Sequence, residues 1–201
     1  MIIGAIRDLF IAREDCFPQQ IDGRNEYTVT RTPLTDDVIL DHLEGTVTIG
    51  CWQADPITHK VKWICFDFDG ELEIEFEKAK NLFMKLVEKS FNPIMEFSGR
   101  RGYHVWLFIE PVDIAVAYAF VSNVSSGASD VYPKSGKIAD GGYGSQMKLP
   151  LGLHRVSMKR SYLFDKQFNQ LSQKDGEVLL IRKSEEKRDK IQPINIETYL
   201  K

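Results

Sequence analysis

The sequence predicts an α+β fold in which mixed, largely antiparallel sheets are flanked by helices. Residues 46–52 and 61–69 are two apolar runs rich in β-branched and aromatic side chains, and the short polar segment between them is typical of a hairpin. Residues 93–97 and 104–110 form a second pair of this kind. Between the two pairs, residues 71–90 have apolar side chains at helical spacing. Hairpins combined with long helices are typical of the α+β class.

Two helices are expected before the first hairpin. Apolar residues recur at helical spacing in the first ten residues, which predicts an amphipathic helix there. Thr35 is then expected to cap a second helix. Asp36 and Asp37 follow in its first turn, where the helix dipole favours acidic side chains. Gly45 is expected to end this helix, because glycine is the usual residue after a helix C-terminus.

The second half of the chain is expected to contain shorter elements. A helix is predicted over 113–124 and a strand over 130–134. A long glycine-rich loop follows at 135–145. Two short extended segments are expected after this loop, at 147–155 and 161–165.

The whole chain, 1–201, is expected to form one catalytic domain. Within it we expect an N-terminal α/β subregion at about 1–45 and a charged C-terminal tail at about 174–201. The tail contains the run SEEKRDK, which is typical of a solvated surface or of a fraying helix. We also expect the chain to be a fragment of a larger protein.

Composition excludes several classes of protein. The chain has 201 residues, of which 43% are hydrophobic and 27% charged, which is ordinary for a globular domain. No apolar run approaches the roughly 20 residues that a membrane span requires, so no membrane partner is expected. Cys16, Cys51 and Cys65 lie far apart, which excludes a cysteine-only zinc site and a disulfide framework and predicts a cytoplasmic protein. The net charge of −3 restricts contact with nucleic acid to a local basic patch.

Asp67 and Asp69 are the first candidate site residues. They lie two apart at the end of an apolar strand, so their side chains are expected on the same face. Two neighbouring carboxylates repel each other, and a divalent cation relieves the repulsion. Oxygen ligands suit Mg²⁺ or Mn²⁺. The simpler alternative is a pair of exposed acids in the turn after a core strand.

A second motif, SGRRGYH, opens the strand at 104–110. Its glycines permit a tight turn, and the backbone N–H groups of such turns can face an anion. Arg100 and His104 add hydrogen-bond donors, and the planar guanidinium of arginine matches a phosphate. The alternative is an ordinary hairpin turn with solvated arginines and a histidine in the core.

A third motif, KLPLGLHR, combines an apolar extended segment with cationic side chains from Lys148 to Arg155. The alternative is a buried edge segment that Pro150 protects from further strand pairing.

In this order the three motifs resemble the archaeo-eukaryotic primase superfamily, in the primase–polymerase branch found in CRISPR-associated and TOTE-type conflict systems. The segments ARED (12–15), PLTD (33–36) and HLEG (42–45) are similar to the N-terminal pattern of that branch. The resemblance covers about residues 8 to 160. It implies a primase–polymerase, RRM-like catalytic core. It also implies a DNA or RNA primase that extends primers through a two-metal carboxylate site.

The resemblance also implies roles for individual residues. Asp130 would be the third metal-binding acid beside Asp67 and Asp69, with Asp140 as the alternative. Asp130 is preferred because its surroundings are those of a strand. The side chains implied to bind the incoming nucleotide are Ser98, Arg100, His104, Lys148 and His154. Arg13 matches a family position to which we assign no role.

The implied cofactor is Mg²⁺ or Mn²⁺. The implied partners are nucleoside triphosphates, a single-stranded DNA template with its primer, and CRISPR adaptation proteins. Two other functions remain open. A haloacid-dehalogenase-type phosphatase also has a D-x-D-G motif after an apolar strand, although Glu71 stands where that family usually has Thr or Val. A nucleotide- or nucleic-acid-binding module without catalysis is the second.

Overall fold

A five-stranded antiparallel sheet lies at the centre of the computed structural model, which describes residues 1–188 and residue 196. The helices are α1 (Ile2–Phe10), α2 (Asp36–Glu44), α3 (Leu72–Glu88), α4 (Ile114–Val124) and α5 (Gln173–Arg188). The strands are β1 (Phe17–Gln20), β2 (Tyr27–Thr30), β3 (Gly50–Trp52), β4 (Lys60–Asp69), β5 (Ile94–Phe97), β6 (Gly102–Asp113), β7 (Asp130–Tyr132), β8 (Gln146–Lys148) and β9 (Tyr162–Leu163).

The central sheet has the strand order β7-β4-β6-β5-β9, and each neighbouring pair is antiparallel. Two small antiparallel sheets, β1-β2 and β3-β8, complete the strands. One bridge between Gln19 and Ile49 connects the two small sheets. The α+β class with largely antiparallel sheets is therefore confirmed.

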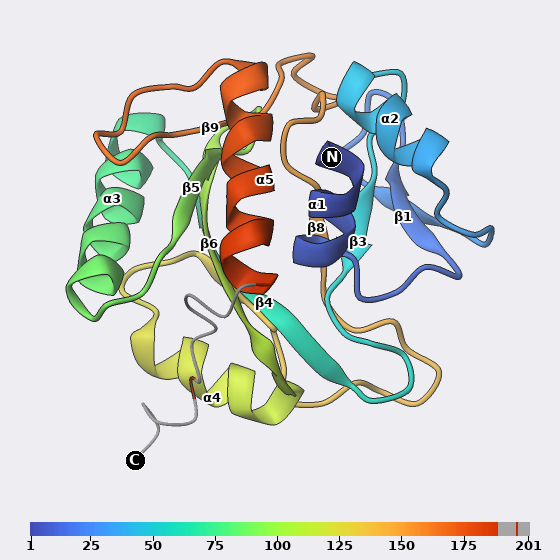
Figure 1. The fold of residues 1–201 in the computed structure, drawn as a ribbon, viewed down its shortest axis with the longest axis horizontal. Coiled ribbons are helices and arrows are strands. Elements are labelled where there is room, and N and C mark those ends of the chain that lie inside the picture. Colours follow the sequence, from blue (N-terminus) through green and yellow to red (C-terminus); the bar gives the residue numbers. More distant parts are fainter. Residues whose placement is uncertain (189–195, 197–201) are drawn as a thin grey trace.

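Both faces of the central sheet are covered by helices (Figure 1). On one face α3 and α4 pack against every second side chain of β4 and β6, among them Phe66 and Val105. On the other face α1, α2 and α5 belong to a second apolar cluster, which contains Trp63 and Trp106. Successive side chains of a strand point to opposite faces, so one strand supplies both clusters.

Most of the expected elements are present. The hydroxyl oxygen of Thr35 accepts a hydrogen bond from the backbone N–H of Val38, and Gly45 ends α2 in the left-handed conformation with φ 91°. The helix expected at 71–90 is α3, and β5 and β6 form the expected hairpin. Asp113 caps α4 by accepting a hydrogen bond from the backbone N–H of Ala115.

The expected hairpin between residues 46–52 and 61–69 is wrong. Strand β3 pairs with β8, so that Gly50 lies opposite Lys148, nearly a hundred residues further along the chain. The reason is that a strand has two edges, and the edges of β4 are occupied by β6 and β7. Just after β3, an isolated bridge pairs Ala54 with Val61 of β4.

Residues 174–188 differ from the expected solvated segment or fraying helix. They belong to α5, in which Leu180 and Ser184 are buried. The hydroxyl of Ser184 donates to the Asp8 carboxylate at 2.7 Å and so joins α5 to α1. The rest of the expected tail, apart from Ile196, lies outside the described residues. Among the described helices, none has the length and apolar character needed to cross a membrane.

His42 of α2 contacts the segment that follows β8. Its side chain is fully buried, its Nδ1 accepts from the backbone N–H of Ile49, and its Nε2 lies 3.2 Å from the carbonyl oxygens of Leu149 and Pro150. Gly152 packs directly on the imidazole, and a Cβ at this position would overlap the ring. The third motif therefore requires glycine here for close approach, not for a special backbone conformation.

We expect Gly152→Ala to destabilise the protein by about 1–3 kcal/mol or more, because overpacking at His42 forces backbone or side-chain shifts. Gly4→Ala is the matched control, since Gly4 lies within α1 and a Cβ there would meet no atom within 4 Å. It should be neutral or stabilising by up to about 1 kcal/mol through helix propensity. Denaturant unfolding of both variants measures the difference, and equal stabilities would contradict the packing at His42.

Candidate active site

The site begins where one face of β4 changes from apolar to acidic. Trp63 and Cys65 on this face belong to the apolar cluster of α1 and α5, and Asp67 and Asp69 continue the same face. Asp67 is half-buried, with its side chain 20% exposed, and Asp69 is exposed. The sequence expectation of two carboxylates on one strand face is therefore met by the geometry.

The strands beside β4 add side chains to this face. In the antiparallel register Asp67 lies opposite His104 of β6 and opposite Asp130 of β7. Residues directly opposite in neighbouring strands share a face of the sheet. Asp67 therefore has a histidine on one side and a second acid on the other.

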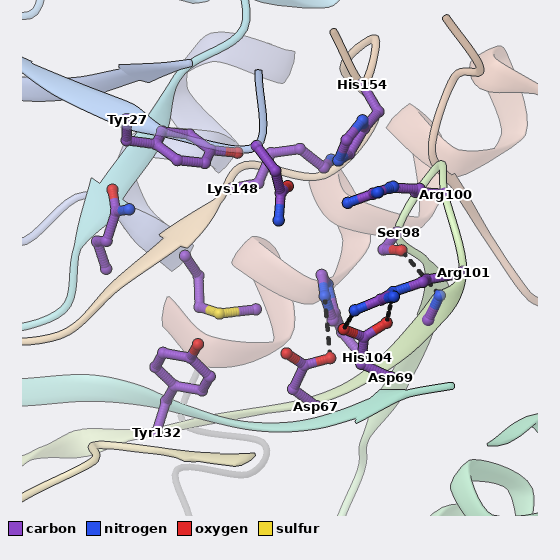
Figure 2. Close-up of a pocket in the computed structure, with 14 residues that line it drawn as sticks. Tyr27, Asp67, Asp69, Ser98, Arg100, Arg101, His104, Tyr132, Lys148 and His154 are labelled. Atoms are coloured by element: carbon purple, nitrogen blue, oxygen red, sulfur yellow. Dashed lines mark hydrogen bonds and ion pairs between the residues drawn. The ribbon is translucent and has the colours of Figure 1, made fainter. Parts of the chain in front are cut away.

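An open pocket of about 260 Å³ lies over this face, between the central sheet and the two small sheets (Figure 2). It is lined by Asn25, Tyr27, Asp67, Asp69, Ser98, Arg100, Arg101, Gly102, His104, Tyr132, Gln146, Met147, Lys148 and His154. Figure 2 shows Asp67, Asp69 and His104 on one side of the pocket, with Tyr27, Lys148 and His154 across from them. Carboxylates thus face cationic and hydrogen-bonding groups across one pocket.

The turn between β5 and β6 presents the second motif to this pocket. The Ser98 hydroxyl oxygen accepts from the backbone N–H of Gly102 at 3.3 Å. Gly99 has φ 92°, and a Cβ there would lie 2.9 Å from the carbonyl oxygen of Lys159. Only glycine therefore fits where this turn packs on the segment that follows the third motif.

Each acid already has a basic partner. Asp69 forms a bidentate ion pair with Arg101, whose Nε and Nη2 lie 2.7 and 2.8 Å from the two carboxylate oxygens. Lys134 Nζ lies 2.8 Å from Asp130 Oδ2. Asp67 Oδ1 lies 3.7 Å from His104 Nε2. In the part of the chain that the structure describes, no three His, Cys, Asp or Glu side chains are placed together as metal ligands.

The acids nevertheless influence one another. Burial raises the pKa of Asp67, and the negative charges of Asp69 and Asp130 raise it further, while His104 opposes the change. This is the behaviour expected of neighbouring carboxylates that share a site. Like-charge repulsion at Asp67 is therefore a property of this arrangement.

Glu96 lies directly beneath the pocket and is fully buried. Its Oε2 accepts hydrogen bonds from His104 Nδ1 and Trp106 Nε1, both at 2.9 Å, and its Oε1 lies 3.4 Å from Lys148 Nζ. Burial would raise the pKa of Glu96, but Lys148 and His104 outweigh it and lower the pKa to about 2. Burial and the charge of Lys148 lower the pKa of His104, but Glu96 and Asp67 outweigh them and raise it.

Lys148 is buried and its ammonium group is fully engaged. Besides Glu96, it donates to the carbonyl oxygen of Leu149 at 2.9 Å and to the Ser161 hydroxyl at 3.0 Å. An ammonium group has three N–H donors, and three acceptors surround this one. A phosphate could bind Lys148 only by replacing one of them.

Arg100 and His154 are differently placed. His154 Nδ1 accepts from the backbone N–H of Val156 at 3.2 Å, so the neutral ring has its proton on Nε2. Burial and the nearby positive charges of Lys148 and Arg100 lower the pKa of His154 to about 4. Among the described residues, none is hydrogen-bonded to His154 Nε2 or to the Arg100 guanidinium. Both groups are therefore free to donate to a ligand.

The structure brings seven of the eight expected site residues to one pocket. Asp130 is adjacent to Asp67 in the sheet but does not line the pocket. The alternative, Asp140, is exposed in the loop after β7 and does not line it either.

Sequence reasoning missed Glu96, the pairing role of Arg101, and Tyr27. Glu96 could have been noticed as the one acid inside the apolar run PIMEF. Tyr27 has no sequence pattern that points to the site, because it comes from a separate hairpin, β1-β2, that folds over the pocket.

The family model for the archaeo-eukaryotic primase domain of TOTE conflict systems matches residues 2–192. The chain belongs to this family. The primase resemblance of the three motifs is thus confirmed over nearly the whole chain. Membership supports a primase-like nucleotidyltransferase function and gives no support to the phosphatase alternative. CRISPR adaptation proteins as partners find no support in it.

Two solved structures share the fold of this primase-family chain. The primase–polymerase domain of cyanophage S-2L has a TM-score of 0.53 at 13% identity, covering 89% of this chain and 95% of that chain. The polymerase domain of ligase D from Mycobacterium tuberculosis, in complex with DNA, has a TM-score of 0.50 at 13% identity, covering 91% and 87%. Among curated proteins, none has a sequence that matches this chain.

The buried and the exposed lysines of this primase-family site should differ in their effect on stability. Lys148→Met leaves Glu96 buried without its main opposite charge and should cost on the order of 3–5 kcal/mol. Lys134→Met removes a surface ion pair, whose two side chains are 49% and 50% exposed, and should cost about 1 kcal/mol or less. Denaturant unfolding compares the two, and a larger loss in Lys134→Met would refute this account of the network.

Proposed function

We propose that the chain is a template-dependent nucleotidyltransferase, a primase and primer-extending polymerase. The observation that supports this most directly is the pocket in which Asp67 and Asp69 face the arginine turn and His154. Acids of this kind can hold metal ions, and cations beside them can hold a triphosphate. Family membership supports this reaction class.

The incoming nucleotide would be held mainly by groups that have donors to spare. Arg100 offers a planar guanidinium for phosphate oxygens. His154 offers its Nε2 proton without adding a charge, because its pKa is about 4. Ser98 and His104 lie beside them in the same pocket. Lys148 belongs to this proposed set as well, but it must first exchange one of its acceptors.

Asp67, Asp69 and Asp130 would hold Mg²⁺ or Mn²⁺. Their donor chemistry fits, since these ions prefer carboxylate oxygens. Burial and, to a smaller extent, the charges of Asp69 and Asp130 raise the pKa of Asp67, and a cation would relieve that repulsion. Asp69 and Asp130 would have to turn away from Arg101 and Lys134. When bound, the metal lowers the pKa of the attacking hydroxyl and stabilises charge on the attacking and leaving oxygens.

The residues of the chain would supply binding and orientation. Arg100 would neutralise phosphate charge and His154 would donate a hydrogen bond, and together they would keep the pyrophosphate in line with the attacking 3′ hydroxyl. Arg101 and Lys134, once released from the acids, would be further cations at the edge of the site. No side chain is assigned as a general base.

The proposed partners are nucleoside triphosphates, either deoxy- or ribonucleotides, and a single-stranded DNA template with its primer. The ligase D polymerase domain, which is similar in fold, was solved in complex with DNA. We propose one catalytic domain over 1–201, with an N-terminal subregion at about 1–45 and a cytoplasmic location.

A second candidate is a nucleotide- or nucleic-acid-binding module without catalysis. The observation in its favour is the set of ion pairs that occupies Asp69 and Asp130. Manganese-dependent incorporation of a labelled nucleotide opposite a single-stranded template separates the two. The binding module would bind the nucleotide and incorporate none.

We expect Asp67→Asn and Asp69→Asn to abolish incorporation while the melting temperature stays close to that of the wild type, because each removes a metal-binding charge. Asp130→Asn should be equally inactive. Asp140→Asn is the matched control, since Asp140 is exposed and outside the pocket, and it should keep most of the activity. Primer extension measures all four, and an inactive Asp140 variant beside an active Asp130 variant would move the third ligand to the loop.

Template binding should be weak and sensitive to salt, because the net charge is −3 and only local cations can contact phosphates. The logarithm of affinity for single-stranded DNA should fall against the logarithm of salt concentration with a slope of about −0.7 per phosphate contacted. Lys159→Gln, on the exposed segment that packs against the Gly99 turn, should make this slope shallower by about 0.7. Lys166→Gln, near α5, is the control. A flat salt response would argue against phosphate contacts.

A further inference from the structure

We propose that Glu96 is a positioning residue, which fixes the ring of His104 and ties the second motif to the third. The proposal rests on the proposed function, in that the positioned ring is one of the groups that would meet the nucleotide. Glu96 itself does not line the pocket.

The position of Glu96 in the sheet is unusual for an acid. It lies on β5 with Ile94 two residues before it, on the face that α1 and α5 cover, and none of its surface is exposed. A buried carboxylate is strongly unfavourable unless it is paired and hydrogen-bonded. Glu96 meets this condition through three donors from three different residues, His104, Trp106 and Lys148.

The contact with His104 determines how the ring faces the pocket. Nδ1 lies 2.9 Å from Glu96 Oε2, and a carboxylate at this distance makes Nδ1 the protonated nitrogen of the neutral ring. Nε2 then points away from Glu96 and lies 3.7 Å from Asp67 Oδ1. Figure 2 shows the ring of His104 beside Asp67 at the floor of the pocket.

The contact with Lys148 joins two distant parts of the chain. Glu96 and His104 belong to the central sheet, whereas Lys148 is the last residue of β8 in a separate sheet. Lys148 also donates to Ser161, just before β9. One carboxylate therefore fixes both the histidine of the second motif and the segment that leads to His154.

A purely structural role gives a different expectation. If Glu96 serves only to balance the charge of Lys148, then a protein without both charges should have the same nucleotide affinity whatever side chain replaces Glu96. If Glu96 positions His104, the replacement must still offer an acceptor to Nδ1. The two roles are separated by a pair of double variants that differ in this acceptor alone.

The test compares E96Q/K148M with E96M/K148M. Both lack the two buried charges, and uncharged pairs of similar volume are often tolerated where ion pairs were buried. Glutamine keeps a carbonyl oxygen for His104 and Trp106, and methionine, which is close to it in size, has no such acceptor. Binding of a nucleoside triphosphate with Mn²⁺, the melting temperature and the protonated ring nitrogen of His104 by ¹⁵N NMR are measured for both.

We expect E96Q/K148M to bind nucleotide more tightly than E96M/K148M by up to roughly tenfold, because Nε2 of the fixed neutral ring is one ordered hydrogen-bond acceptor toward the nucleotide, and this hydrogen bond is lost in the latter. The neutral ring should have its proton on Nδ1 in the glutamine variant and a mixture of the two forms in the methionine variant. Adding His104→Ala should weaken binding by the glutamine variant and change that of the methionine variant little, because the unpositioned ring contributes little there.

Equal affinities in the two folded double variants, with the ring proton on Nδ1 in both, would overturn the proposal. If E96M/K148M does not fold, Glu96→Asp replaces it, because aspartate keeps the charge for Lys148 and draws the acceptor back by one methylene. It should then show the same loss of affinity and the same mixture of ring forms. A wild-type protein that binds no nucleotide would refute the proposed function instead, and the ring proton would still decide the role of Glu96.

Discussion

β4 and β6 pair in antiparallel register from Lys60 opposite Asp113 to Asp69 opposite Gly102. Both strands are buried on both faces over most of this length, so the pairing register and the face to which each side chain points are fixed. A slip by one residue would put Phe66 and Phe68 into the pocket and Asp67 against α3. The same pairing that builds the two apolar clusters therefore also places the acids and His104 together.

The charges of the site are organised as a set of opposing pairs. Asp69 is matched by Arg101 of the neighbouring turn, Asp130 by Lys134, and Asp67 by the more distant His104. These pairs are of unequal strength, since two are exposed and one borders a buried network. Asp67 is the least directly paired acid and the most buried of the three, and its pKa is raised by burial and further by the charges of Asp69 and Asp130. In the proposed mechanism a bound divalent cation would be stabilised most by its contact with Asp67.

The third motif depends on contacts from parts of the chain far from it in sequence. His42 of α2 holds the backbone at Leu149 and Pro150, and Thr48 donates to the carbonyl oxygen of Leu153. Arg160 donates to the carbonyl oxygens of Leu43 and Leu151, again connecting α2 with this segment. A loop with so many long-range backbone contacts is a preorganised part of the site, even though it contains little regular structure.

Local patterns in the sequence were enough to predict several elements. Apolar alternation and helical spacing predicted β4, α3, the β5-β6 hairpin and the capped helix α2, because these elements form between neighbours in the chain. The two acids could be assigned to one face because the period of a strand is two. The tight turn SGRRGYH could be predicted because its glycines permit it. Family resemblance then gave the expected functional residues, seven of which line one pocket.

The long-range partners follow from packing in three dimensions. β3 pairs with β8 instead of β4 because both edges of β4 are already occupied. α5 packs against α1 through contacts that could not be predicted from its charged sequence. The same holds for Glu96, whose partners come from β6 and β8, and for Lys148, whose three donors are engaged inside the protein. Sequence fixes which side chains can pair or ionise. Which of them meet, and which remain free for a ligand, follows from packing between residues that are distant in the chain.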